Sequence, residues 1–105
     1  MMEAIHFVEK LGNYRVVSEE TGEWESGYWN VTVDAAAQLV GGDIFLHPGQ
    51  LKPSTIGGKI TGFRIATEKN SDRIIFRFQK LDSHEGVVTE KEGWGNEQKR
   101  VQSSE

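Results

Sequence analysis

The sequence predicts a mainly β domain of the α+β class that contains one short helix. Two segments in which polar and apolar residues alternate, residues 59–67 and 73–79, are separated by a polar stretch of hairpin length. The chain also contains 12 glycines against 2 prolines, which is typical of short strands joined by tight turns. A run of alanines near residues 35–40 predicts the helix.

Size and composition predict one domain. The chain has 105 residues, of which 36% are hydrophobic, and this is enough for one modest core. We expect a compact domain over residues 1–101 and a disordered tail over residues 102–105. No apolar run reaches the ~20 residues of a membrane span, and the N-terminal stretch lacks the basic start of a signal peptide. The absence of cysteine excludes disulfides and thiolate chemistry, so a cytoplasmic location is the simplest expectation.

The segments before the helix differ in how clearly they predict structure. Residues 2–11 fit either a short helix or an irregular strand. Residues 14–18 are rich in β-forming side chains and predict a strand. Residues 19–27 are polar and predict a loop, whereas residues 28–33 alternate and predict a strand.

The helix and the strands around it follow from local signals. Asp34 is the expected N-cap of the helix at residues 35–40, and Gly41 is its expected left-handed stop. Residues 44–47 predict a short buried strand, and residues 87–89 predict the last strand of the chain.

The central hairpin has an apolar face and a charged face. Its predicted core consists of Phe63, Ile65, Ile74, Phe76 and Phe78. Arg64 and Arg77 then lie on the opposite surface as cross-strand neighbours. Because like charges repel at this spacing, the pair predicts either an anionic ligand or a glutamate of the same chain between the two arginines.

Signatures of catalysis are missing from the sequence. We find no nucleophile elbow, phosphate-binding loop, dinucleotide fingerprint or cysteine nucleophile. His6, His47 and His84 are scattered, and no pair has the spacing of a helical metal site. We therefore predict no metal and no cofactor, and a small enzyme that uses a carboxylate with His47 or His84 is the last-ranked of three hypotheses.

The loop at residues 48–58 has two interpretations. Lys52, Ser54 and Thr55 lie close to a pair of glycines, so their side chains and the backbone N–H groups could hold an anion. The alternative is a structural connection in which glycine allows an unusual backbone angle at the entry to the next strand.

The large aromatic side chains have the same two interpretations. Trp24 and Trp94 lie in polar, glycine-containing segments, where they could stack on a nucleic-acid base or cover the sheet. Trp29 is expected in the core. His47 follows a buried strand, where a structural role is the expectation and a role in a pocket is the alternative.

Short motifs follow one another in order between residues 28 and 80: Tyr28-Trp29, then Gly42-Asp43 before a strand, then Gly58-Lys59-Ile60 opening the next. This order resembles the small β-barrel of the PUA-like superfamily, which includes the EVE and ASCH domains. The resemblance implies an antiparallel pseudo-barrel that binds RNA or a modified DNA base in an aromatic-lined pocket. The matching positions are Trp29, His47 and the surface of Arg64 and Arg77.

These observations favour a non-catalytic domain that recognises nucleic acid or a modified nucleotide. The candidate ligand-binding residues are Trp24, Trp29, His47, Lys52, Ser54, Thr55, Arg64, Arg77 and Trp94. The alternative is a protein–protein interaction module that uses an exposed strand edge, which the net charge of −4 favours. The expected partners are thus RNA, modified DNA or a protein, and no membrane.

Overall fold

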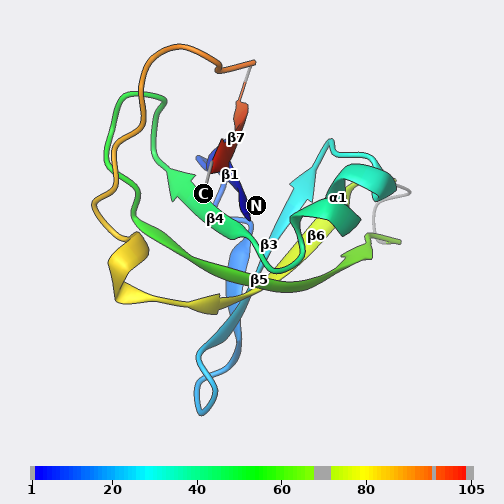
Figure 1. Cartoon of the computed structure of the whole chain (residues 1–105). Helices are drawn as coiled ribbons and strands as arrows, with labels where there is room; N and C mark the ends of the chain where they lie inside the picture. The colour runs from blue at the N-terminus through cyan, green and yellow to red at the C-terminus, as the bar shows by residue number, and fades with distance from the viewer. Residues whose placement is uncertain (1, 68–71, 96, 104–105) are drawn as a thin grey trace.

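The computed structural model describes residues 2–67, 72–95 and 97–103, and its architecture is mainly β (Figure 1). The strands are β1 Met2–Val8, β2 Tyr14–Ser18, β3 Glu23–Trp29, β4 Asp43–His47, β5 Ile56–Ile65, β6 Ile74–Lys80 and β7 Gln98–Ser103. They form one seven-stranded sheet in the order β2-β3-β6-β5-β4-β1-β7. Helix α1 spans Val33–Leu39. None of the helices in the described ranges is long and apolar enough to cross a membrane.

The sheet is mixed, which corrects the expectation of a purely antiparallel one. Strands β1 and β4 run parallel, with Ile5 opposite Ile44. The chain between them contains β2, β3 and α1, which together provide the long crossover that a parallel pair requires. The first segment is therefore a strand and not a helix. Strands β2 and β7 stand at the two ends of the strand order.

Helix α1 begins two residues earlier than predicted. The side chain of Thr32 accepts a hydrogen bond from the backbone N–H of Ala35 at 3.1 Å, so Thr32 is the N-cap and Asp34 lies in the first turn. Asp34 was thus the wrong cap, because a threonine two residues earlier satisfies the same N–H groups. Gly41 has a φ of 90°, which confirms the left-handed stop after the helix.

Strand β3 occupies a segment where the sequence predicted a loop. It spans Glu23–Trp29, whereas the predicted strand at residues 28–33 overlaps it only at its end. The polar composition misled the prediction. Glu25 faces arginines of the neighbouring strands, and Ser26 accepts a hydrogen bond from the Trp29 indole at 2.9 Å, so the polar side chains of β3 have partners within the sheet.

The central hairpin is confirmed, with one change in its core. Phe76 and Phe78 are fully buried, and Phe63 packs against the same core. Ile65 is 47% exposed and was wrongly assigned to the core, because it lies at the end of β5. A register shift between Ile60 and Gly62 brings Ile60 into the core as well. The predicted turn at residues 68–72 lies largely outside the described residues.

The last strand also differs from the prediction. Residues 87–89 form no strand, and β7 lies instead at Gln98–Ser103, antiparallel to β1. Backbone pairing with β1 therefore extends through Gln102 and Ser103, where a disordered tail was expected. The charged composition of this segment did not indicate a strand. Since β7 lies at the edge of the sheet, and edge strands commonly carry charge, this composition is compatible with its position.

The two faces of the sheet have different coverings. Figure 1 shows the bent strands β5 and β6 sweeping beneath α1. The core on the helix side consists of Ile5, Phe7, Ala36, Leu39, Ile44, Leu46, Ile56, Ile60, Ile74, Phe76 and Phe78. On the opposite face, His84 and Trp94 cover side chains of β1 and β4, whereas the outer surface of β2, β3, β6 and β5 carries charged side chains.

Candidate functional site

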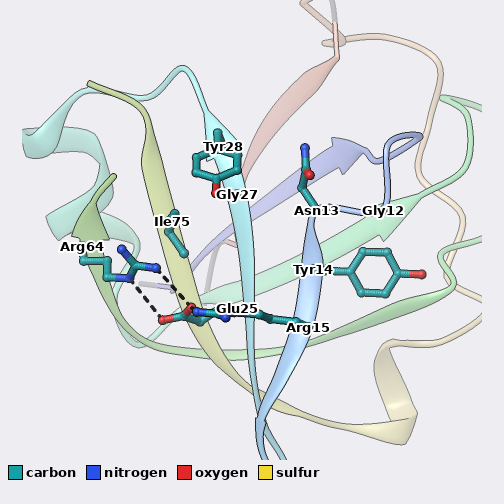
Figure 2. A pocket seen from close by; sticks show the side chains of 9 residues that line it. All are labelled: Gly12, Asn13, Tyr14, Arg15, Glu25, Gly27, Tyr28, Arg64 and Ile75. Atoms are coloured by element: carbon teal, nitrogen blue, oxygen red, sulfur yellow. Dashed lines mark hydrogen bonds and ion pairs between the residues drawn. The ribbon is translucent and has the colours of Figure 1, made fainter. Parts of the chain in front are cut away.

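A buried carboxylate lies among three arginines on the outer surface of the sheet. Oε1 of Glu25 lies 3.1 Å from Nη2 of Arg15 on β2. Oε2 lies 3.4 Å from Nε of Arg64 on β5 and 3.9 Å from Nη2 of Arg77 on β6. Figure 2 shows Arg64 and Arg15 reaching Glu25 from opposite sides. We call this surface of Arg15, Glu25, Arg64 and Arg77 the arginine face.

Strand register brings these four side chains together. Glu25 on β3 is paired with Arg15 on one side and with Arg77 on the other. Arg77 is paired with Gly62, and Arg64 lies two residues further along β5. Side chains two residues apart on a strand share a face, so all four project outward. The glutamate predicted as one of two possible neighbours of Arg64 and Arg77 is therefore Glu25.

The four side chains of the arginine face carry more positive than negative formal charge. Burial by itself would raise the pKa of Glu25, but hydrogen bonds from Arg64 and Arg15 outweigh it and hold that pKa below its usual value. Glu25 is thus ionised at neutral pH. Three guanidinium groups less one carboxylate leave a local charge of +2. The Glu25 side chain is only 8% exposed, whereas those of Arg15, Arg64 and Arg77 are 71%, 41% and 44% exposed.

A pocket of about 250 Å³ opens beside Glu25 (Figure 2). Its lining consists of Gly12, Asn13, Tyr14, Arg15, Glu25, Gly27, Tyr28, Arg64 and Ile75. Gly27 has no space for a side chain, because a Cβ at this position would lie 2.7 Å from Cγ1 of Ile75. The pocket combines guanidinium groups with the ring of Tyr28.

A larger cavity of about 600 Å³ adjoins this pocket. It shares Asn13, Gly27 and Tyr28 with the smaller one and adds Trp29 and Arg73. Its remaining lining comes from the end of β1, the start of β7 and the chain near them: Val8, Glu9, Lys10, Leu11, Asn30, Glu97 and Gln98. The two cavities are neighbours, because they share three lining residues, and together they lie between the arginine face and the chain near the end of β1 and the start of β7.

The predicted tryptophans are placed apart from one another. Trp24 packs partly buried against the core, with its ring centroid 6.1 Å from that of Tyr14. Trp29 stacks on Phe7 with ring centroids 3.8 Å apart, which confirms its place in the core, and it also lines the larger cavity. Trp94 lies over the far part of the sheet, against His47.

His47 is fully buried in a cluster of rings on the outer face of β1 and β4. Its Nε2 lies 2.8 Å from Nδ1 of His6, and its Nδ1 lies 2.7 Å from the carbonyl oxygen of Lys52. Phe45 stacks between His6 and His84, at centroid distances of 4.5 and 4.7 Å. His47 is thus remote in the fold from the arginine face and lines neither of the two cavities described above.

The loop residues proposed to hold an anion make internal contacts. The hydroxyl of Ser54 donates to the carbonyl of His84 and accepts from the N–H of Val87 at 3.0 Å. The hydroxyl of Thr55 donates to the carbonyl of Leu46 at 3.3 Å. Lys52 contributes its backbone carbonyl to His47. These contacts favour the structural interpretation of the loop.

The sequence did not predict Arg15, Glu25 and His6 as site or cluster residues. The expected repulsion between Arg64 and Arg77 indicated a neighbouring glutamate, but it did not indicate which one.

No family model, curated protein or solved structure matches this chain. In the described ranges, no group of three histidine, aspartate or glutamate side chains is arranged to hold a metal ion.

Proposed function

We propose that the arginine face binds nucleic acid or a nucleotide, with phosphate groups on the arginines and a base in the adjoining pocket. The observation that carries this proposal is the convergence of Arg15, Arg64 and Arg77 on one ionised glutamate beside an open cavity. Guanidinium groups bind phosphate through paired N–H donors, and the partly exposed arginines present such donors to solvent.

Glu25 contributes by holding the arginines in place. Long side chains lose rotamer entropy on binding, and a side chain already ordered by an ion pair loses less. Glu25 neutralises one of the three positive charges, so the local excess of +2 remains attractive to phosphate. The whole chain has a net charge of −4, which favours binding at this face over a broad electrostatic coat.

In this proposal a base contacts Tyr28, which lines both cavities, and Trp29, which lines the larger one. Aromatic rings stack on bases of any identity, with about 1–3 kcal/mol per stacked base. Of the two tryptophans first considered for stacking, Trp24 packs against the core on the same strand as Glu25, and Trp94 lies against His47. Selectivity for a modified base is part of the proposal and would depend on the shape of the cavity.

The PUA-like barrel is part of the same proposal. Two contacts join the end of β3 to strands at the far side of the curved sheet. Trp29 stacks on Phe7 of β1, and the side chain of Gln98 on β7 donates a hydrogen bond of 3.1 Å to the carbonyl of Asn30. Such contacts support a partly closed barrel with the larger cavity at its seam. A cytoplasmic location also remains a prediction.

The test is a fluorescence titration with short single-stranded and double-stranded oligonucleotides, with and without modified bases, at low and moderate salt. We expect saturable binding that weakens with salt. Arg15→Ala and Arg77→Ala should each weaken binding about fivefold or more at low salt and reduce the salt slope by about 1. Circular dichroism should show that both variants remain folded.

Lys52→Ala is the matched control, because it also removes one positive charge but lies in the loop at residues 48–58. It should bind like the wild type. Equal losses in Lys52→Ala and the arginine variants would contradict a defined arginine face. A larger loss in Lys52→Ala would favour the loop as the anion site.

A protein partner is the second candidate, and the edge strand β2 favours it. Val16 and Val17 on this strand are each 39% exposed, and β2 is at the end of the strand order. An extended peptide could add to this edge through backbone hydrogen bonds. If all oligonucleotides give a flat response at low salt, this candidate becomes the better account.

A further inference from the structure

We propose that His6 and His47 form an acid-sensitive latch, which holds residues 88–95 against the outer face of β1 and β4 at neutral pH and releases them in acid. The latch is separate from the arginine face and does not depend on the proposed function. It is inferred from the hydrogen bonds of the two imidazoles, from their burial and from what covers them.

The contacts of the pair indicate which ring nitrogens donate and which accept hydrogen bonds. The carbonyl of Lys52 accepts hydrogen bonds, so the neighbouring Nδ1 of His47, at 2.7 Å, carries a proton. In a neutral His47, Nε2 is then an acceptor, and Nδ1 of His6, at 2.8 Å, donates to it. One chain of hydrogen bonds thus runs from His6 through His47 to the carbonyl of Lys52.

Additional protons are unfavourable at this place. His6 is 5% exposed and His47 is fully buried. A first proton could be shared along the hydrogen bond, but its charge would be buried beside Lys99, which faces His6 from β7. A second proton would leave two N–H donors facing each other.

Charged groups around the cluster offer no compensation for such a proton. Lys99 donates from Nζ to the carbonyl of Glu90 at 2.7 Å. The nearby carboxylate of Asp43 lies on the other side of Phe45, where it accepts from His84 at 2.9 Å and pairs with Lys59 at 3.4 Å. The loop at residues 48–55 faces His47 with the Lys52 carbonyl.

Residues 88–95 are attached at the same place. The indole ring of Trp94 contacts His47 edge-on at a centroid distance of 5.7 Å and His6 at 6.3 Å. Lys99 holds the segment through the carbonyl of Glu90. Residues 84–87 are attached differently, because the backbone N–H of Ser54 donates to the carbonyl of Val87 at 2.8 Å, and this contact does not titrate.

The direction of the pH effect follows from His6. Burial, then the charges of His47 and Lys99, lower the pKa of His6 from 6.5 to about 4. An opened state in which His6 is solvated takes up a proton on His6 below pH 6.5, whereas His6 in the closed state resists protonation down to about pH 4. The closed state therefore loses stability as pH falls through this window, and the ratio of open to closed molecules rises on the order of 100-fold.

The test is two-dimensional NMR with amide hydrogen exchange between pH 7.5 and 4.5, corrected for the intrinsic pH dependence of exchange. We expect residues 88–95 and the Trp94 indole to lose protection as pH falls, while residues 84–87 and strands β5 and β6 keep theirs. Constant protection of residues 88–95 would overturn the proposal. Simultaneous loss in β5 and β6 would also overturn it, because it would show global unfolding.

Two variants assign the effect to the histidine pair. His6→Phe keeps a ring on Phe45 but cannot titrate, so the acid-induced loss of protection in residues 88–95 should disappear. His84→Phe is the control, since it removes a histidine from the other side of Phe45 and should leave that transition in place. If His6→Phe does not fold, the NMR titration of the His6 ring in the wild type decides: a pKa near 6.5 with residues 88–95 still protected overturns the latch.

Discussion

Substitution of Glu25 by glutamine separates the structural role of the carboxylate from its effect on a bound anion. Glutamine has nearly the same shape but no charge, so the contacts of Glu25 with Arg15 and Arg64 lose their ionic part. We expect the free energy of unfolding to fall and the affinity for an oligonucleotide to rise. Most substitutions in a binding site lower both quantities, so opposite signs are diagnostic.

The loss of stability follows from burial and exposure. Glu25 is 8% exposed, and removal of a partner from a fully buried ion pair costs about 3–5 kcal/mol. The arginines are 41–71% exposed, however, and exposed pairs contribute only about 0–1 kcal/mol. The glutamine can still accept one hydrogen bond. An intermediate loss of about 1–2 kcal/mol is therefore expected.

The gain in affinity follows from Coulomb's law. The variant raises the local charge from +2 to +3, because one carboxylate is removed from among three guanidinium groups. A phosphate held about 5 Å from that position, at the dielectric constant of water, gains about 0.8 kcal/mol, which corresponds to about fourfold tighter binding at low salt. The gain should shrink at moderate salt, because screening weakens it.

Urea denaturation and the oligonucleotide titration measure the two effects on the same samples. Glu85→Gln is the control, since Glu85 is 48% exposed and pairs with Lys80 at 3.6 Å instead of with the three arginines. It should change stability by less than about 0.5 kcal/mol and affinity by less than the Glu25 variant does. A Glu25→Gln protein that binds more weakly would refute the reasoning, because it would show that the carboxylate itself contacts the ligand or that the loss of arginine order outweighs the gain in positive charge.

Two further predictions concern packing. Gly58→Ala should lower the free energy of unfolding by about 1–3 kcal/mol, because its Cβ would lie 1.8 Å from the backbone oxygen of Gln79. Gly62→Ala is the control, since nothing lies within 4 Å of its Cβ, and its free energy of unfolding should stay within about 1 kcal/mol of the wild type. Equal losses for the two variants in urea denaturation would contradict this prediction. Leu39→Ala should cost about 2–5 kcal/mol, because Leu39 is fully buried where α1 meets the sheet; a loss below about 1 kcal/mol would show that the helix is dispensable for stability.

Local patterns in the sequence were sufficient for the elements whose side chains alternate or repeat clearly. The strand at Asp43–His47, the hairpin of β5 and β6 and the helix with its Gly41 stop follow from such patterns. Strands β3 and β7 were missed for a shared reason. Their polar side chains are stabilised by partners from distant parts of the chain, and the composition of a short segment does not indicate such partners.

The histidine pair was missed because it depends on a non-local contact. His6 and His47 are 41 positions apart and meet only because β1 and β4 pair in parallel, with His6 next to Phe45 in register. A purely antiparallel sheet would not predict this neighbourhood. The same parallel pairing also determines where residues 88–95 can lie, since Trp94 contacts both imidazoles.

A single irregularity in β5 connects the core to the arginine face. Strict alternation puts Ile60 and Phe63 on opposite faces, yet both pack against the core. The register shift between Ile60 and Gly62 resolves this conflict, because one extra residue exchanges the faces of all positions after it. Arg64 consequently points outward to Glu25 instead of sharing the face of Ile60. The irregularity that lets both Ile60 and Phe63 be buried thus also determines the position of Arg64 in the proposed binding site.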